Sequence, residues 1–309
     1  MDPGYGDPRL AALRAAATGP GTDGGRWPGI AGQLSLAVDG EDLTWLVEGL
    51  ASVDGTEAWI GAVAAEAPDP ALPLLVSGAR HIEWAWQART RKMAKYVSKE
   101  QFEVFHARLA VAEEQLYEVA EREPDWAAPW YFLQIAGRGL QVGQRLAARR
   151  FEAAVRRSPG HLAGHRQQLQ QVCGKWGGSH AQMHDFARQA MLGAPEGSPL
   201  GELVAIAHLE HWLDEEAGAD TRYIRRSDVV VELYEAAERS VHHPDFVRRR
   251  DWTRSFNTFA LAFALAGENE AARDLFRVLE GSVTEFPWMY LNGHDPTVPF
   301  REWRSRVGA

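Results

Sequence analysis

The stretch FNTFALAFALAGENEAARDLFRVL, residues 256–279, decides the fold. In each half, large apolar residues and alanine recur at the three- and four-residue steps that line one face of a helix. Gly267 stands between the halves, where one helix can end and the chain can turn back. The stretch therefore predicts two consecutive antiparallel helices. Their apolar positions are Phe256, Phe259, Ala260 and Phe263 in the first helix and Ala272, Phe276 and Leu279 in the second.

A related helix recurs earlier in the chain at a fixed distance. Leu116, Phe151 and Phe186 stand 35 residues apart, and each lies among small and large residues at helical spacing. A period in this range is typical of a two-helix unit that cannot bury its apolar face alone and stacks on its neighbours. The alternation of Val, Ile and Thr that marks strands is nearly absent. A proline that can end each helix follows at Pro124, Pro159 and Pro195.

These patterns resemble tetratricopeptide repeats over about residues 42–290. In that family, small residues let paired helices approach closely and large residues join each unit to the next. The resemblance implies an all-α, TPR-like α-solenoid of stacked antiparallel helix pairs. The Trp176-Gly177-Gly178 turn and the overall layout are similar to uncharacterised bacterial proteins of the domain-of-unknown-function type, and this similarity implies no activity.

The expected array is irregular. Long helices are predicted over residues 71–96 and 98–122, the second opened by a capping box at Ser98 and Gln101. An insertion near residues 217–228 lengthens a later unit.

Three regions follow from these patterns. Residues 1–40 are rich in Gly and Pro and predict a loosely held lead-in, with a flexible loop at 19–25 and local docking through Trp27 and Leu34. Residues 41–290 predict the TPR-like helical-repeat domain. Residues 291–309 predict a C-terminal cap or tail, because a solenoid must cover its last apolar face.

Composition excludes several classes of protein. The formal net charge is −9 and the pI is about 5.7, which argues against a nucleic-acid partner. Short arginine clusters at 149–150, 156–157 and 248–250 are interpreted as solvated helix faces. No apolar run is long enough to span a bilayer, so no membrane partner is expected.

The expected location of the protein in the cell follows from two features that the sequence lacks, a signal peptide and paired cysteines. The start of the chain has no basic and apolar segments of a signal peptide. Cys173 is the only cysteine, so no intrachain disulfide can form, and it is expected to be a buried, unreactive thiol. A cytoplasmic location is therefore expected. Only four of the basic residues are lysine, and Ala and Gly are abundant, which indicates a GC-rich bacterial genome.

Histidine pairs were considered as metal ligands. His161/His165 and His180/His184 are spaced four residues apart, so each pair shares a helix face. If the two helices form a hairpin centred on Trp176, the pairs are offset by about 10 Å along the helix axes at about 1.5 Å per residue. That offset is too large for one coordination shell. No metal and no cofactor are predicted.

His208, His211 and Glu215 form the most site-like cluster in the sequence, on one stripe of a helix predicted over residues 201–216. A metal or acid–base role is one interpretation, since histidine titrates near neutral pH. A polar face lining a groove, or histidine packed against a neighbouring helix, is the other. An all-α enzyme or ligand-binding protein centred on these residues is the alternative function.

The leading functional hypothesis is a non-catalytic module that binds a protein or peptide, because helical-repeat superhelices present a groove lined by the first helix of each unit. A structural or regulatory subunit of an oligomer is a third option. The partner's identity and the oligomeric state stay open. The groove candidates are His81, Trp84, Gln134, Arg138, Gln167, Gln171, His208, His211, Arg254 and Asn257.

Overall fold

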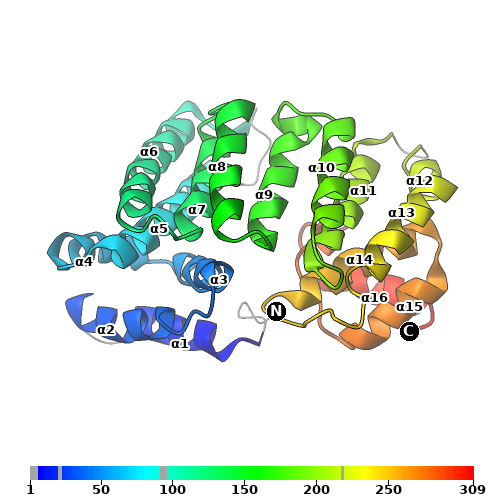
Figure 1. The fold of residues 1–309 in the computed structure, drawn as a ribbon, viewed down its shortest axis with the longest axis horizontal. Coiled ribbons are helices and arrows are strands. Elements are labelled where there is room, and N and C mark those ends of the chain that lie inside the picture. Colours follow the sequence, from blue (N-terminus) through cyan, green and yellow to red (C-terminus); the bar gives the residue numbers. More distant parts are fainter. Residues whose placement is uncertain (1–5, 20–22, 91–95, 217–218) are drawn as a thin grey trace. The chain divides into compact units, whose positions relative to one another are not determined.

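A computed structural model describes residues 6–19, 23–90, 96–216 and 219–309. Within these ranges all regular structure is helical and no strand is present, which confirms the predicted all-α class. None of the helices in the described ranges combines the length and apolar composition needed to cross a bilayer. The chain divides into two compact units (Figure 1), the N-terminal unit Asp2–Gln171 and the C-terminal unit Val172–Ala309.

In the N-terminal unit, the helices from α5 to α8 pack in chain order. α5 lies along α6, α6 packs on α7, and α7 packs on α8 (Figure 1). The helices are α1 Pro8–Thr18, α2 Asp23–Leu34, α3 Gly40–Ala51, the short 3-10 helix η1 Thr56–Ala58, α4 Ile60–Glu66, α5 Ala71–Arg89, α6 Lys99–Arg122, α7 Ala128–Gly139, α8 Gln144–Arg157 and α9 Leu162–Val172.

The expected lead-in contributes to the core of this unit. Leu10 and Leu13 of α1, and Ile30 and Leu34 of α2, are buried in the same apolar cluster as residues of α3 to α7. Trp27 is partly buried against that cluster. The expectation of a loosely held segment is therefore wrong for residues 8–18 and 23–34, because their apolar faces are covered. Residues 20–22 of the expected loop lie outside the described ranges.

The C-terminal unit is arranged around α11, which packs against α10, α12, α13 and α14. α14 and α15 form the hairpin that residues 256–279 predict, and Gly267 ends α14 in the left-handed conformation at φ 88°. The elements are η3 Gly174–Trp176, α10 His180–Gly193, η4 Pro199–Gly201, α11 Glu202–Asp214, α12 Ala219–Ile224, α13 Ser227–Glu238, α14 Trp252–Ala266, α15 Asn269–Leu279, η5 Trp288–Tyr290 and α16 Thr297–Arg306.

Other local expectations have mixed outcomes. The capping box at Ser98 and Gln101 is present at the start of α6. The helix expected over residues 71–96 ends at Arg89, followed by Thr90 at φ 65°, and residues 91–95 lie outside the described part of the chain. The boundary between Gln171 and Val172 falls inside the repeat domain predicted over 41–290, and that domain's limits stay a prediction.

The arginine cluster at residues 149–150 is not entirely the solvated helix face that the sequence predicts. Arg150 is 1% exposed and lies inside the N-terminal unit, so this side chain is not part of a solvated face. Its guanidinium lies beside Gly137, where a Cβ atom would be 2.4 Å from Nη1. Gly139 is closely covered by Phe105 and Leu109. Both glycines therefore serve close helix packing.

Candidate functional site

Six of the ten groove candidates belong to the N-terminal unit, and they differ in accessibility. Gln134 and Gln171 are buried, whereas the other four are half-buried. Arg138 Nη2 donates to Gln167 Oε1 at 2.7 Å, which joins α7 to α9. The six residues are His81 and Trp84 on α5, Gln134 and Arg138 on α7, and Gln167 and Gln171 on α9.

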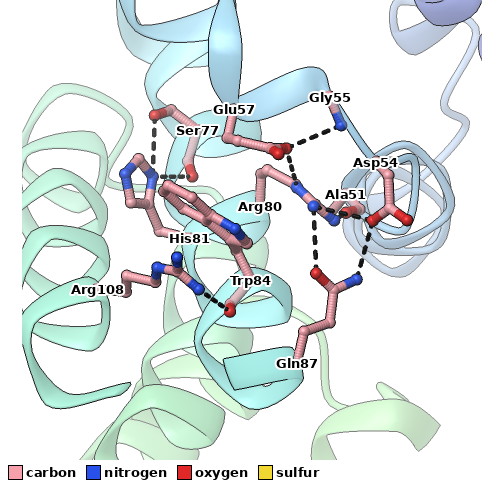
Figure 2. A network of polar contacts seen from close by, with 10 residues as sticks. All are labelled: Ala51, Asp54, Gly55, Glu57, Ser77, Arg80, His81, Trp84, Gln87 and Arg108. Atoms are coloured by element: carbon pink, nitrogen blue, oxygen red, sulfur yellow. Dashed lines mark hydrogen bonds and ion pairs between the residues drawn. The ribbon is translucent and has the colours of Figure 1, made fainter. Parts of the chain in front are cut away.

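His81 and Trp84 are held by neighbouring groups (Figure 2). His81 Nδ1 donates to the Ser77 carbonyl at 2.9 Å. The Arg108 guanidinium of α6 lies 3.4 Å from the centre of the Trp84 ring, and its Nη1 donates to the Trp84 carbonyl at 2.6 Å. Burial, aided by the nearby Arg80 charge, lowers the pKa of Arg108. These contacts fix the two candidate side chains within the unit.

Arg80, one residue before His81, joins several segments of the chain through hydrogen bonds, a role that the sequence did not predict (Figure 2). Its side chain is 1% exposed and donates to the Ala51 carbonyl at 3.0 Å, to Glu57 at 2.6 Å and to Asp54 at 3.0 Å. The guanidinium ties α5 to the end of α3 and to η1. Hydrogen bonds from Gln87 and Arg80 lower the pKa of Asp54. Burial acts to raise the pKa of Glu57, but hydrogen bonds, including that from Arg80, outweigh it and lower this pKa.

Replacing Arg80 with methionine is expected to lower the free energy of unfolding by about 2 kcal/mol, because the buried Ala51 carbonyl loses its donor. Asp54 is 80% exposed and regains water, which keeps the loss below that of a fully buried ion pair. Urea unfolding measures the change. The control is Arg122→Met, which removes an exposed ion pair to Glu118 on α6 and is expected to cost under about 0.5 kcal/mol. Equal effects of the two changes would contradict the assigned role.

Gln134 is the candidate with unsatisfied hydrogen-bonding groups. Its side chain is 5% exposed, and neither Oε1 nor Nε2 has a hydrogen-bond partner within the described part of the chain. Its Nε2 lies close to Gly164 of α9, where an added Cβ would be 3.6 Å away. Arg138 follows one helical turn later on the same helix. A buried amide without partners costs free energy unless another group satisfies it.

Two candidates in the C-terminal unit lie under its final segment. Asn257 is 0% exposed; it donates to the Thr253 and Ser282 carbonyls and accepts from Trp288 Nε1 at 2.6 Å. The Arg254 guanidinium lies 4.6 Å from the Phe286 ring. Asn257 therefore does not line an open groove, because its amide is fully used in packing.

His208 and His211 belong to a polar cluster that links four helices. We define the histidine cluster as His184 of α10, His208 and His211 of α11, Tyr223 of α12 and Glu232 of α13. His208 is 3% exposed, so it too does not line an open groove.

The cluster is connected by four short contacts. His208 Nε2 lies 3.0 Å from Glu232 Oε2, and His208 Nδ1 lies 2.8 Å from the Tyr223 hydroxyl. His184 Nε2 lies 3.0 Å from His211 Nδ1 and 3.2 Å from the Tyr223 hydroxyl.

These contacts fit one arrangement of protons with neutral rings. His208 Nε2–H donates to Glu232, and the Tyr223 hydroxyl donates to His208 Nδ1. His184 Nε2–H then points to both His211 Nδ1 and the Tyr223 oxygen. His211 Nε2–H donates to Glu215 at 3.3 Å. Every polar hydrogen along the chain of contacts thus meets an acceptor.

Electrostatics favour the neutral forms of His184 and His211 and the ionised form of Glu232. Burial, aided by His208 and His211, lowers the pKa of His184 to about 3. Burial also lowers the pKa of His211 and raises that of Tyr223. The hydrogen bond from His208 lowers the pKa of Glu232. Unprotonated imidazoles beside a carboxylate are the state that metal ions and hydrogen-bonding ligands require.

The residues of the alternative site are only partly brought together. Glu215, the third of them, lies outside the cluster and pairs with His211 at 3.3 Å. His180 stacks on His211 at 3.8 Å between ring centres and pairs with Asp214 at 3.0 Å, at the exposed edge. The remaining pair, His161 and His165, packs in the N-terminal unit. His161 Nε2 lies 3.0 Å from Thr44 Oγ1, and burial lowers the pKa of His165.

The sequence contained a signal for this cluster. Residues that face each other across a helical hairpin are about equidistant from the turn. For the α10–α11 hairpin, whose turn is near Ser198, His184 lies 14 residues before and His211 lies 13 after. For the turn at Trp176, the same comparison places His161/His165 and His180/His184 too far apart along the helix axes to share one site. Tyr223 and Glu232, from later helices, carry no comparable local signal.

Cys173 is 3% exposed, and burial raises the pKa of its thiol, in line with the expected unreactive cysteine.

Comparison of the chain with protein-family models, curated proteins and solved structures gave no match. Functional inference therefore depends on the sites themselves.

Proposed function

We propose that the chain is a TPR-like helical-repeat protein of the bacterial cytoplasm that binds an extended segment of a partner protein and is not an enzyme. The binding surface lies in the N-terminal unit, along α7 and α9, the first helices of successive pairs. The observation that carries the proposal is the amide of Gln134, which is buried in the unbound chain and has no hydrogen-bond partner among the described residues. It occurs at a position that the repeat pattern had assigned to the groove.

The chemistry of Gln134 matches a peptide group. A carboxamide offers a donor and an acceptor side by side, so it can pair with both the carbonyl and the N–H of one extended peptide unit. The folded chain covers both atoms, so the partner segment has to displace the groups above them. Pairing would then remove the cost of leaving the two amide groups unsatisfied, which is about 1–3 kcal/mol for each buried group.

Arg138 and Gln167 supply the adjoining polar contacts. Both are half-buried and bonded to each other, so the Arg138 guanidinium is held in a fixed position. Arginine binds carboxylates through paired N–H groups. The proposed partner segment therefore carries an acidic side chain or a terminal carboxylate about one helical turn from the peptide group that meets Gln134.

Replacing Gln134 with leucine is expected to raise the free energy of unfolding by about 1 kcal/mol, because an unsatisfied buried amide becomes an apolar group of similar size. Urea unfolding of the purified chain measures the change. The matched control is Gln144→Leu, which removes a donor to the Gln171 carbonyl and is expected to lower stability. A loss of stability in both variants would show that Gln134 is satisfied within the folded chain.

The binding test uses peptides displayed in a random library and selected on the immobilised chain. Peptides that carry a carboxylate are expected to be enriched and to lose at least about tenfold in affinity on Arg138→Ala and on Gln134→Leu, since each loses a charge-assisted or paired hydrogen bond. Arg122→Ala, at an exposed ion pair, serves as the control. Absence of enrichment, or equal binding to all variants, would overturn the proposal.

A further inference from the structure

We infer that His184, His208 and Glu232 form a site for a divalent transition-metal ion, with zinc as the best-matched ion. The inference is independent of peptide binding, because the three residues lie in the C-terminal unit. It also revises the expectation that the chain holds no metal.

The donor atoms are already gathered. One ligand atom from each of the three residues lies within 4.8 Å of the other two, and the residues come from α10, α11 and α13. Because three helices contribute one donor each, the site exists only in the folded unit. Binding to the folded state alone would stabilise the packing of these helices.

The donor types select the class of ion. Two imidazole nitrogens and one carboxylate oxygen form a ligand set that zinc uses at about 2.0–2.2 Å, with a fourth position left for water or another ligand. Magnesium and calcium prefer sites built from oxygen donors, so they fit this set poorly. Cys173, the chain's only thiol, is not among these donors.

The hydrogen bonds around His208 show how this residue would coordinate the ion. His208 Nε2 and Glu232 Oε2, 3.0 Å apart, share the proton that the ion would replace. With the ion bound, the His208 ring proton would move from Nε2 to Nδ1 and donate to the Tyr223 oxygen, which reverses the direction of the 2.8 Å hydrogen bond between these two groups. A ligating histidine commonly has such an outer partner, which fixes the ring and its tautomer. Tyr223 is therefore a positioning residue.

Charge also favours binding. Glu232 contributes a negative charge, and its side chain is 42% exposed, so this ligand is reachable from solvent. His211 and Glu215 pair with each other at the border of the site.

The test measures metal binding by the untagged full-length chain after dialysis against a chelator. One equivalent of zinc, and one of cobalt(II) with the visible absorption of a four-coordinate nitrogen- and oxygen-ligated ion, are expected. Magnesium is expected not to compete at a hundredfold excess. His208→Gln and Glu232→Gln are each expected to weaken zinc binding at least tenfold.

Two of the variants distinguish the loss of a metal ligand from misfolding and from a nonspecific effect of substitution. Glu232→Gln changes a partly exposed side chain, so it reports on the site even if His208→Gln fails to fold. His180→Gln is the matched control, since this histidine belongs to the same helix as His184 but pairs with Asp214. Retained zinc binding in His180→Gln is expected. Substoichiometric binding, or an equal loss in the control, would overturn the inference.

Discussion

Replacing Trp288 with alanine is expected to lower the free energy of unfolding of the C-terminal unit by about 3–5 kcal/mol. The side chain is 0% exposed and packs between Phe276 of α15 and Phe300 of α16, with ring centres 5.8 and 5.4 Å away. Removing the indole leaves a cavity among aromatic rings and deprives the buried Asn257 amide of a hydrogen bond. These two losses add, which places the expected effect among the largest for a single substitution.

Two further variants separate the contributions. Trp288→Phe keeps most of the ring contact but removes the indole N–H, so it is expected to cost about 1–2 kcal/mol. Trp303→Ala removes a half-buried tryptophan of α16 and is expected to cost clearly less than Trp288→Ala, because less surface is buried there. Urea unfolding monitored by circular dichroism measures all three. A loss below about 1 kcal/mol for Trp288→Ala would contradict the anchoring role.

Trp288 also shows what the sequence could and could not predict. The hairpin of residues 256–279 was predictable because its apolar spacing and Gly267 are local features. Asn257 lies on the first helix of that hairpin and was expected on a groove, since it is polar. Its burial depends on Trp288, which is 31 residues later in the chain. No periodic pattern reports a contact of that kind.

The histidine cluster illustrates a different limit. His208 and His211 were recognisable from their spacing on one helix, and His184 could have been joined to them by the geometry of the next hairpin. Glu232 and Tyr223 could not, because their approach depends on how α12 and α13 pack against α11. The sequence therefore contained a signal for the three histidines of the cluster, and tertiary packing supplied the carboxylate and the phenol.

Buried arginines escaped prediction for a related reason. Arg80 and Arg150 occupy positions that an amphipathic pattern assigns to solvent, yet each is 1% exposed. Long side chains of this kind can reach carbonyls and carboxylates on adjacent helices, and the partners that make burial tolerable are distant in sequence. For Arg150, these partners come from α6 and α7.

Replacing Arg150 with methionine is expected to lower the free energy of unfolding by about 3 kcal/mol. Its Nη1 donates to the Leu133 carbonyl at 2.7 Å, and its Nη2 donates to the Tyr117 hydroxyl at 2.9 Å and pairs with Glu113. Methionine fills part of the volume but leaves a buried carbonyl and a largely buried carboxylate without their donor. Glu113 is 29% exposed, so water recovers part of the loss and keeps it at the lower end of the range for buried pairs.

A double-mutant cycle with Gly137 tests whether the guanidinium itself is responsible. A methyl group at Gly137 would meet Arg150 Nη1 at 2.4 Å, so Gly137→Ala alone is expected to displace the guanidinium and to cost about 1–3 kcal/mol. In the Arg150→Met background the conflict with the guanidinium is absent, and the contact with Val142 at 3.0 Å remains. The two changes are therefore expected to be less than additive by at least about 1 kcal/mol. Additive losses would show that Arg150 and Gly137 contribute to stability separately. Subadditive losses would show that both residues act through one contact between α7 and α8, which the buried Arg150 guanidinium makes.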